Sequence, residues 1–314
     1  MTEARPVVLV TGANGFVGRH LAALLEARGW TVRRAQRTLT GGEHEVQIGS
    51  IGPQTDWRAA LDGVAAVVHL AARVHHPNEE NAGEIYRTIN TDGTLQLARS
   101  AAAAGVQRFI YLSTILVNGA TSEGRGPFRE NDDPKPRGVY GQSKAAAEAG
   151  LEAIAGQSAM QVSIIRPPLI YGRGAVGNFR LLVKMVRLGA PLPFASIRNR
   201  RAFLGVQNLS SFIAHRLTAA GRRFDIFLVA DDEQISTPEF VRRIAAAAGK
   251  PARLVPCPEP LLRGLLKLSG RAEAGDSLIA SMEVDMSKAL ASGWQPELSQ
   301  PAGLRLAVEA SGYD

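Results

Sequence analysis

The feature that most constrains the fold is a short apolar run near the N-terminus that ends in three glycines. The run Val7–Val10 has the composition of a buried strand, and residues 19–26 beyond the glycines show helical spacing. Gly12 permits a backbone geometry that a Cβ would obstruct, Gly15 lets the main chain approach a ligand, and Gly18 lets the helix pack against the strand. The helix N-terminus offers unpaired N–H groups and a positive dipole end to an anion. The stretch therefore predicts a site for the pyrophosphate of a dinucleotide, with an ordinary strand–helix turn as the alternative.

The length and composition are those of a soluble globular protein. A chain of 314 residues holds one large domain, or a nucleotide-binding domain with a smaller one. Its hydrophobic content of 45% and charged content of 21% are ordinary for that class. Cys257 is the only cysteine, so no internal disulfide is possible, which agrees with a reducing compartment. Residues 1–6 are too short and polar for a signal peptide, and no apolar run reaches the roughly 18–20 residues of a membrane span. We therefore expect a cytoplasmic protein with no membrane partner.

The net charge of +7 raises the question of nucleic-acid binding. The arginines stand in short scattered groups, without interleaved aromatic residues or a nucleic-acid motif. An anionic cofactor and an anionic substrate explain a basic cleft more simply. His75 and His76 are adjacent, but neighbouring residues rarely converge on one ion and no ligand spacing recurs. We therefore expect neither a nucleic-acid partner nor a metal.

Strand and helix patterns alternate along the first half of the chain. Strand-like runs occur at residues 7–10, 31–36, 45–48, 65–70, 108–114 and 161–166. This alternation predicts an α/β fold with a doubly wound parallel (Rossmann) sheet. From about Gly174 the alternation becomes irregular, apart from a late strand over Phe227–Ala230. We expect an NAD(P)-binding domain with the catalytic helix over residues 1–173, and a smaller substrate-binding lobe over 174–314 from which some strands return to the main sheet.

The end of the second strand bears on the choice of cofactor. In dinucleotide-binding folds an acid at this place accepts a hydrogen bond from the 2′-hydroxyl of the adenosine ribose. Here the residues are Gln36 and Arg37, so no acid is available to repel a 2′-phosphate, and Arg37 could pair with one. This charge pattern favours NADP(H) over NAD(H), unless Arg37 is an ordinary solvated arginine.

A tyrosine and a lysine four residues apart supply the chemistry. Tyr140 and Lys144 open a helical run and therefore lie on one face of it. A free tyrosine has a pKa of about 10, and a nearby ammonium together with an oxidised nicotinamide favours the phenolate and lowers that pKa. The phenol then exchanges a proton with a substrate oxygen at physiological pH. Thr114, or less favourably Ser113, closes the fifth strand at the end where ligands bind, and would hold the same oxygen.

Alone, Tyr-x-x-x-Lys is common and usually means a half-buried aromatic ring and a surface lysine. Its order after the glycine turn and the hydroxyl pair is what indicates an active site. These motifs, beginning with TGANGFVG, resemble the extended branch of the short-chain dehydrogenase/reductase superfamily and its NAD-dependent epimerase/dehydratase family. The resemblance covers nearly the whole chain. It implies that Thr114 is the catalytic hydroxyl beside Tyr140, and that Lys144 also bonds the nicotinamide ribose.

The resemblance implies two sets of binding residues. The cofactor set comprises Gly12, Gly15, Phe16, Val17, Gly18, Gln36, Arg37, Leu70, Ala71, Ala72, Lys144 and Pro167, and the substrate set comprises Ser113, Asn178 and Arg201. Asn90 matches an asparagine that holds the central helix against the active-site strand. Ser50 stands where the family usually has an aspartate for the adenine amino group, so the adenine contact is left open.

The implied activity is that of an NAD(P)-dependent oxidoreductase acting at C4 of a nucleotide-diphosphate sugar. Residues 165–172 and 198–201 look most like a bacterial branch that acts on UDP-N-acetylhexosamine derivatives, and NADPH favours net reduction by a 4-ketoreductase. A UDP-sugar 4-epimerase uses the same groups and is the alternative. A 4,6-dehydratase would carry Asp-Glu after the catalytic threonine, where this chain has Ile115 and Leu116.

The alternative to an enzyme is a binding protein that senses a dinucleotide and has lost catalysis. Such a protein would be expected to lack Tyr140 or Lys144, and both are present. Members of the resembled family often form homodimers, so a second copy is a possible partner besides the nucleotide sugar.

Overall fold

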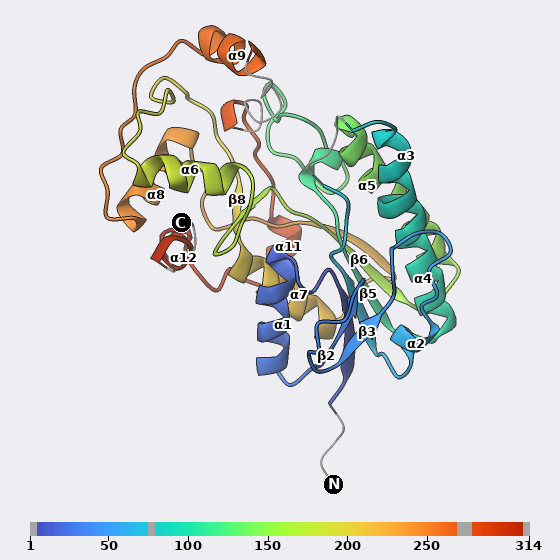
Figure 1. Ribbon diagram of the computed structural model, residues 1–314. Helices are drawn as coiled ribbons and strands as arrows, with labels where there is room; N and C mark the ends of the chain where they lie inside the picture. Colours follow the sequence, from blue (N-terminus) through green and yellow to red (C-terminus); the bar gives the residue numbers. More distant parts are fainter. Residues whose placement is uncertain (1–4, 75–78, 269–277, 310–314) are drawn as a thin grey trace.

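The computed structural model describes residues 5–74, 79–268 and 278–309 (Figure 1). A seven-stranded sheet, parallel throughout, forms its centre, with the strand order β3-β2-β1-β4-β5-β6-β9. The strands are β1 (Val7–Thr11), β2 (Thr31–Gln36), β3 (Glu45–Gln47), β4 (Ala66–His69), β5 (Arg108–Leu112), β6 (Gln161–Arg166) and β9 (Phe224–Leu228). The predicted doubly wound parallel sheet is therefore confirmed.

Helices cover both faces of the sheet, and Figure 1 shows them as two layers. One layer contains α1 (Phe16–Ala27) and α7 (Val206–Thr218), and the other contains α2 (Arg58–Leu61), α4 (Gly93–Ala103) and α5 (Gly138–Gly156). Successive side chains of a strand point to opposite faces, so Val8 and Val10 pack with the first layer and Leu9 packs with the second. Because both faces are buried, the central strands β1 and β4 are apolar except for their last residues, Thr11 and His69.

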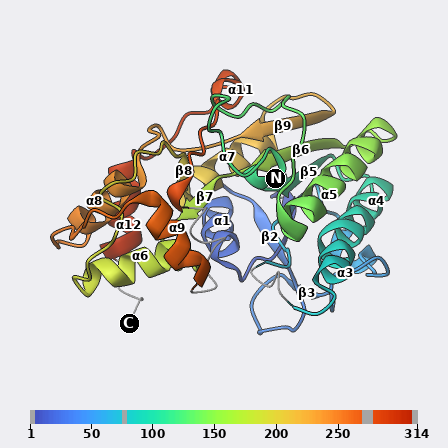
Figure 2. The same ribbon diagram turned by 90° about the horizontal axis from the view of Figure 1, so that it is seen from above.

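A second group of elements forms a lobe beside the sheet, on the left of Figure 2. It contains the short parallel pair β7 (Leu169–Tyr171) and β8 (Phe203–Gly205), and the helices α6 (Asn178–Arg187), α8 (Thr237–Ala247), α9 (Glu259–Leu268) and α12 (Gln300–Glu309). Its own apolar core is built around Phe179, Phe203 and Phe240. Between these elements the chain returns to the sheet through α7 and β9, while the boundary at residue 174 stays a prediction.

The late strand lies earlier than the sequence indicates. The apolar run Phe227–Ala230 suggested the strand, but β9 is Phe224–Leu228 and includes the charged residue Asp225. Asp225 is buried, and its carboxylate accepts a hydrogen bond from the Arg222 backbone (3.0 Å) and pairs with Lys288 (3.0 Å). The ion pair with Lys288, from distant α11 (Ser287–Ala291), makes an acid acceptable in this strand, and local hydropathy cannot reveal such a partner.

The strand order determines where a ligand binds. The chain runs from β1 outward through β2 and β3 and then crosses to β4 on the other side of β1. Ligands of open α/β sheets bind at this reversal, beyond the carboxyl ends of the strands. Gly12 follows β1 there, and Ala71 follows β4. Within the described ranges, no helix has both the length and the apolar character needed to cross a membrane.

Candidate active site

The glycine turn after β1 has the close contacts that its sequence predicts. Gly12 has φ +68°, and a Cβ there would lie 3.0 Å from the Ala71 backbone nitrogen. At Gly18 a Cβ would lie 2.2 Å from the Gly12 carbonyl oxygen, so only glycine lets α1 pack onto the turn. Gly15 is the N-cap of α1 in extended backbone, and no side chain caps this end. The helix therefore presents unpaired N–H groups, which suit a phosphate.

A cavity of about 610 Å³ opens beside this turn. It is lined by Gly12, Ala13, Asn14, Gly15, Ala35, Gln36, Arg37, Thr38, Thr40, Ile48, Ser50, Ile51, Ala71, Ala72, Arg73 and Ile89. Six of the predicted cofactor residues are in this lining, from three separate parts of the sequence. The size, the glycine cradle and the uncapped helix fit the adenosine and pyrophosphate end of a dinucleotide.

The other predicted cofactor residues lie around this cavity and not in its lining. Phe16 packs into the core of the lobe, and Val17 and Leu70 pack against the core between α1, α7 and the sheet. Pro167 is buried just after β6, and its carbonyl oxygen accepts a hydrogen bond from the Ile115 backbone (3.0 Å). Cofactor contacts by these four residues stay predictions.

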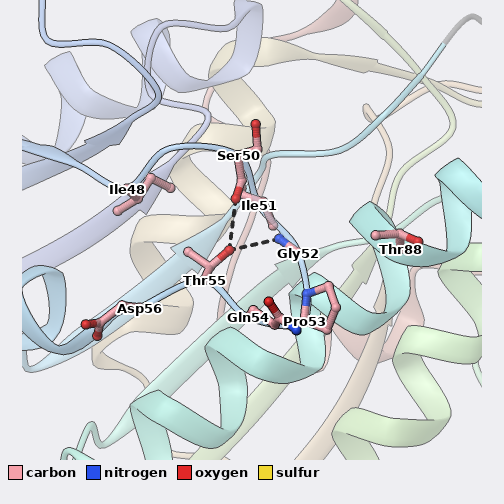
Figure 3. A pocket seen from close by; sticks show the side chains of 9 residues that line it. All are labelled: Ile48, Ser50, Ile51, Gly52, Pro53, Gln54, Thr55, Asp56 and Thr88. Carbon is pink, nitrogen blue, oxygen red and sulfur yellow. Dashed lines mark hydrogen bonds between the residues drawn. The ribbon is translucent and has the colours of Figure 1, made fainter.

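The adenine end is bounded by a turn that Thr55 holds together. The Thr55 hydroxyl donates to the Ser50 carbonyl oxygen (2.9 Å) and accepts from the Gly52 backbone (2.9 Å), as Figure 3 shows. The turn encloses a second, smaller pocket, which Figure 3 shows. Three of its lining residues also line the larger cavity beside the glycine turn: Ile48, Ser50 and Ile51. The Ser50 hydroxyl points away from Thr55 in Figure 3, which leaves it available at the place where the family usually has an aspartate.

One premise of the cofactor prediction is wrong, because an acid does stand beside Gln36. It comes from β3 and not from the end of β2. The Glu45 carboxylate accepts a hydrogen bond from Gln36 Nε2 (2.6 Å), and it also accepts from the Thr40 backbone (2.7 Å) and the Gly41 backbone (3.1 Å). Hydrogen bonds from Thr40 hold the pKa of Glu45 below its ordinary value. Sequence position could not reveal this contact, since strand pairing brings the two residues together.

The predicted Tyr–Lys pair lies on the first turns of α5. Tyr140 is half-buried and Lys144 is buried. Lys144 Nζ lies 5.9 Å from the centre of the Tyr140 ring and 4.3 Å from the centre of the Tyr111 ring. It also donates to the carbonyl oxygen of Leu112, the last residue of β5 (2.7 Å). Lys144 therefore ties the catalytic helix to the strand that ends at the predicted hydroxyl pair.

Backbone contacts hold the turn after Thr114 against the first residues of α5. Thr114 follows β5 and its hydroxyl accepts from the Leu116 backbone (3.3 Å), which caps a short 3₁₀ turn over Ile115–Val117. The Arg137 backbone, just before α5, donates to the Leu116 carbonyl oxygen (3.1 Å). A Cβ at Gly141 would lie 3.2 Å from that same oxygen. Glycine beside Tyr140 thus lets the catalytic helix approach the turn that Thr114 caps.

A π-helical turn hydrogen-bonds to α5 at Ser143, which lies between Tyr140 and Lys144. In place of one regular helix, this part of the chain forms α3 (Ala82–Tyr86), a π-helical turn (Arg87–Asp92) and α4. From that turn, Asn90 Nδ2 donates to the Ser143 hydroxyl (3.1 Å), and the Thr91 hydroxyl donates to the Ser143 carbonyl oxygen (2.8 Å). Asn90 also bonds both backbone groups of Arg73. Its side chain therefore contacts α5 and the segment after β4, whereas only its carbonyl oxygen contacts Tyr111 of the active-site strand (3.4 Å).

A buried ionic network that sequence reasoning missed lies behind the site. Glu148 pairs with Arg166 (2.5 Å), and their side chains are only 5% and 2% exposed. Arg166 also donates to Asn118 Oδ1 (3.0 Å). The Ser113 hydroxyl donates to Glu148, so the structure gives this predicted substrate ligand a partner in the interior. The spacing Tyr140, Lys144, Glu148 along one helix face was the signal that could have found the network.

Burial changes the pKa values of the predicted Tyr140–Lys144 pair. It lowers the pKa of Lys144 to about 7, and the nearby Glu148 carboxylate partly opposes this. Burial also raises the pKa of Tyr140, and the adjacent Tyr86 adds to the effect. The lowering expected for Tyr140 is therefore absent in the protein alone, since Lys144 donates to Leu112 and carries a weakened charge. The expectation of a lower pKa now depends on the positive charge of an oxidised nicotinamide.

The lowered pKa of Lys144 predicts a pH-dependent stability. Between about pH 7 and 10.5 the unfolded chain binds a proton that the folded chain lacks, so the cost of burying this amine falls as the pH rises. We expect the free energy of unfolding, compared with that of Lys144→Met, to rise by about 2–3 kcal/mol from pH 7.5 to 9.5. Urea denaturation at both pH values measures this. The matched control is Lys184→Met, an exposed lysine, which should keep the wild-type pH dependence.

The two remaining predicted substrate residues belong to the lobe. Asn178 is the first residue of α6. Arg201 is only 3% exposed, and its guanidinium donates to the Ala280 carbonyl oxygen while its Nε has no hydrogen-bond partner. Burial lowers the pKa of Arg201 to about 10. A buried guanidinium with an unpaired donor is costly, and an anionic ligand would stabilise it.

His69 is fully buried with both ring nitrogens bonded. Nδ1 lies 2.7 Å from the Thr11 hydroxyl, and Nε2 lies 2.9 Å from the Thr94 hydroxyl. Burial lowers the pKa of His69 to about 3, so the ring is neutral and structural. His75 and His76 lie outside the described residues, and the described part of the chain contains no group of three metal-ligating side chains.

Comparison with known proteins gives relatives along nearly the whole chain. The sequence profile of the NAD dependent epimerase/dehydratase family matches residues 8–230. The UDP-glucose 4-epimerase of Vibrio cholerae is 36% identical over 310 residues, which cover 96% of this chain and 94% of that protein. The UDP-glucose 4-epimerase of Thermus thermophilus, in complex with NAD, has a TM-score of 0.77 at 24% identity, with 96% of this chain and 98% of that one covered. RMD from Pseudomonas aeruginosa, complexed with NADPH, has a TM-score of 0.73 at 24% identity, covering 97% and 98%.

Proposed function

This chain belongs to the NAD-dependent epimerase/dehydratase family, and we propose that it is a UDP-sugar 4-epimerase. The observation that carries the proposal is the assembly of Tyr140, Lys144 and Thr114 at the carboxyl end of β5. Asn90 joins the helix of Tyr140 and Lys144 to Arg73, which lines the cavity beside the glycine turn. The 36% identity to a UDP-glucose 4-epimerase along almost the full length of both chains supports the substrate class and the position of the reaction.

Tyr140, Thr114 and Lys144 would each have a separate role in the reaction. Tyr140 takes the proton of the sugar 4-hydroxyl during oxidation and returns it to the same oxygen during reduction. Thr114 donates a hydrogen bond to that oxygen and keeps it in line with the phenol. Lys144 supplies positive charge beside the phenol and bonds the nicotinamide ribose hydroxyls. A bound nicotinamide supplies the acceptor and donor of the hydride.

Arg201 is the proposed contact for the nucleotide diphosphate. Arg201→Met should weaken UDP binding by roughly 10–100-fold, because a charge-assisted bond to phosphate is lost. Calorimetric titration of UDP into the folded protein measures this. The control is Arg200→Met, since Arg200 is the exposed neighbour and its guanidinium pairs with Glu283 (3.1 Å). Equal losses in both variants would show that net charge, and not a specific contact, governs binding.

A turnover assay tests the epimerase proposal. The protein is incubated with UDP-glucose, and with UDP-N-acetylglucosamine, and the products are resolved by chromatography. The expected result is interconversion of the 4-epimers without net consumption of added NADH or NADPH. Dinucleotide binding without turnover of either sugar nucleotide would contradict the proposal and favour the non-catalytic sensor.

The second candidate is a 4-ketoreductase that acts on a UDP-N-acetylhexosamine derivative with NADPH. The observation that favours it is Arg37, an exposed arginine in the lining of the dinucleotide cavity, where it can reach a 2′-phosphate. Stoichiometric oxidation of NADPH with a UDP-4-keto sugar would distinguish it from the epimerase. A 4,6-dehydratase is less well supported, because the two residues after Thr114 are apolar.

A further inference from the structure

Most of the exposed large apolar side chains lie on the lobe beside the sheet. Ten such side chains are exposed among the described residues, and seven of them belong to this lobe, including Leu181, Leu188 and Val255. Single exposed leucines are ordinary, whereas a group of them on one part of a molecule marks a contact surface. The lobe therefore presents apolar surface that its own core does not use.

The outer face of α6 combines two of these leucines with two basic side chains. This face, which we call the α6 patch, consists of Arg180, Leu181, Lys184 and Leu188. All four are exposed, and their spacing of three, four and seven residues puts them on one side of the helix. The opposite side of α6 packs into the apolar core of the lobe, and the helix lies at the outer edge of the lobe in Figure 2.

The segment between α8 and α9 extends the α6 patch by one basic and one apolar side chain, Arg253 and Val255, which are both exposed. Leu192, which follows α6, holds this segment through backbone bonds to Arg253 (2.8 Å) and Val255 (2.9 Å). A Cβ at Gly189 would lie 3.8 Å from the guanidinium carbon of Arg253. The charge of Arg253 therefore stands beside Leu188, at the end of the helix.

The basic side chains of this surface have no counter-charge within the described part of the chain. None of Arg180, Lys184 and Arg253 forms an ion pair there. The sequence between Glu152 and Asp225 contains eleven Lys and Arg residues and no Asp or Glu. The lining of the dinucleotide cavity, as the described residues define it, includes none of the three, so an anionic cofactor does not explain them.

We propose that the α6 patch, together with Arg253 and Val255, binds the surface of an anionic lipid bilayer. The leucines and the valine would enter the boundary between headgroups and acyl chains. The stems of the lysine and the arginines lie along such an apolar layer while their charged ends reach the lipid phosphates. The expectation of no membrane partner rested on the lack of a spanning segment, and binding to a surface requires none.

Other partners match this surface less well. Lysine is depleted in protein–protein interfaces, yet Lys184 stands in the middle of the α6 patch. The backbone of a nucleic acid offers phosphates without an apolar layer for the leucines. A symmetric contact with a second copy of the chain would set the same positive charges against one another. The inference rests on the charge and apolar surface of the lobe and not on the chemistry of the sugar nucleotide.

Co-sedimentation of the full chain with lipid vesicles tests the inference. The wild-type protein should bind vesicles made of equal parts of phosphatidylcholine and phosphatidylglycerol at least roughly tenfold more tightly than vesicles of phosphatidylcholine alone, and added salt should weaken this binding. The double variant Arg180→Gln/Lys184→Gln should bind the anionic vesicles roughly 30-fold more weakly. Leu188→Asn should bind them roughly tenfold more weakly, because an apolar side chain no longer enters the bilayer.

Two matched controls separate this surface from net charge and general hydrophobicity. Arg222→Gln/Arg223→Gln removes the same charge from exposed arginines just before β9, and Leu290→Asn changes an exposed leucine on α11. Both should bind like the wild-type protein. Equal weakening by the control and the test variants would overturn the inference. It would also be overturned by wild-type protein that does not sediment with anionic vesicles, or that binds an acidic peptide or duplex DNA in their place. These wild-type results need neither a folded variant nor sugar turnover, so they are independent of the epimerase proposal.

Discussion

Tyr140→Phe should lower kcat by roughly 10³-fold while the dissociation constant of the dinucleotide changes by less than about threefold. The substitution removes one oxygen atom, the one that we expect to exchange a proton with the sugar 4-hydroxyl. The ring itself remains and keeps its edge-on contact with Tyr86, at 6.3 Å between ring centres. The helix that carries Lys144 should therefore stay in place.

Initial rates of epimerisation and calorimetric binding of the dinucleotide measure the two quantities. Tyr111→Phe is the control, because it also removes the hydroxyl of a buried tyrosine whose ring lies against Lys144. That hydroxyl donates a long bond to the Asn90 carbonyl oxygen (3.4 Å) and hydrogen-bonds with the Thr94 side chain. We expect it to retain most of the wild-type rate. A Tyr140→Phe protein with near wild-type turnover would falsify the assignment of Tyr140 as the proton-transfer group.

Glu148→Gln should lower the free energy of unfolding by about 3 kcal/mol. The variant leaves the Arg166 guanidinium buried without a counter-charge, and removing one partner of a buried pair costs more than the pair contributes. It also weakens the acceptor of the Ser113 hydroxyl at the end of β5. For a domain whose total stability is on the order of 5–15 kcal/mol, this loss is severe.

Urea denaturation followed by far-UV circular dichroism measures this loss. Glu152→Gln is the matched control, because it makes the same change one turn later on α5 at an exposed position. It should change the free energy of unfolding by less than about 0.5 kcal/mol. Equal stability of the two variants would contradict the view that Glu148 and Arg166 anchor the catalytic helix to β6.

Local sequence was enough to locate the glycine turn and the Tyr–Lys helix. At Gly12 and Gly18 the reason for glycine lies within a few residues, so the spacing of the glycines revealed it. Tyr140 and Lys144 lie on one helix face by the geometry of the helix alone. The strand pattern likewise predicted the parallel sheet, because a central strand that is buried on both faces, such as β1, is almost entirely apolar.

Local sequence patterns did not reveal the contacts between residues that are far apart in the chain. The π-helical turn over Arg87–Asp92 interrupts the helical run between α3 and α4, and its Asn90 side chain hydrogen-bonds to α5. β9 begins at Phe224 and includes Asp225, whose ion-pair partner Lys288 lies far along the chain. Each of these features depends on a partner far along the chain, which no local pattern specifies.

The amino-acid sequence by itself determined the family fold and the glycine turn, and it predicted the Tyr140–Lys144 pair, because each follows from periodicity and spacing within a short segment. The tertiary structure alone decided the surroundings of those groups. It placed Glu45 beside Gln36, tied Lys144 to the end of β5 and joined Glu148 to Arg166. The physical reason is that charge, burial and hydrogen-bond orientation depend on through-space distance, and the pairing of strands and helices sets that distance.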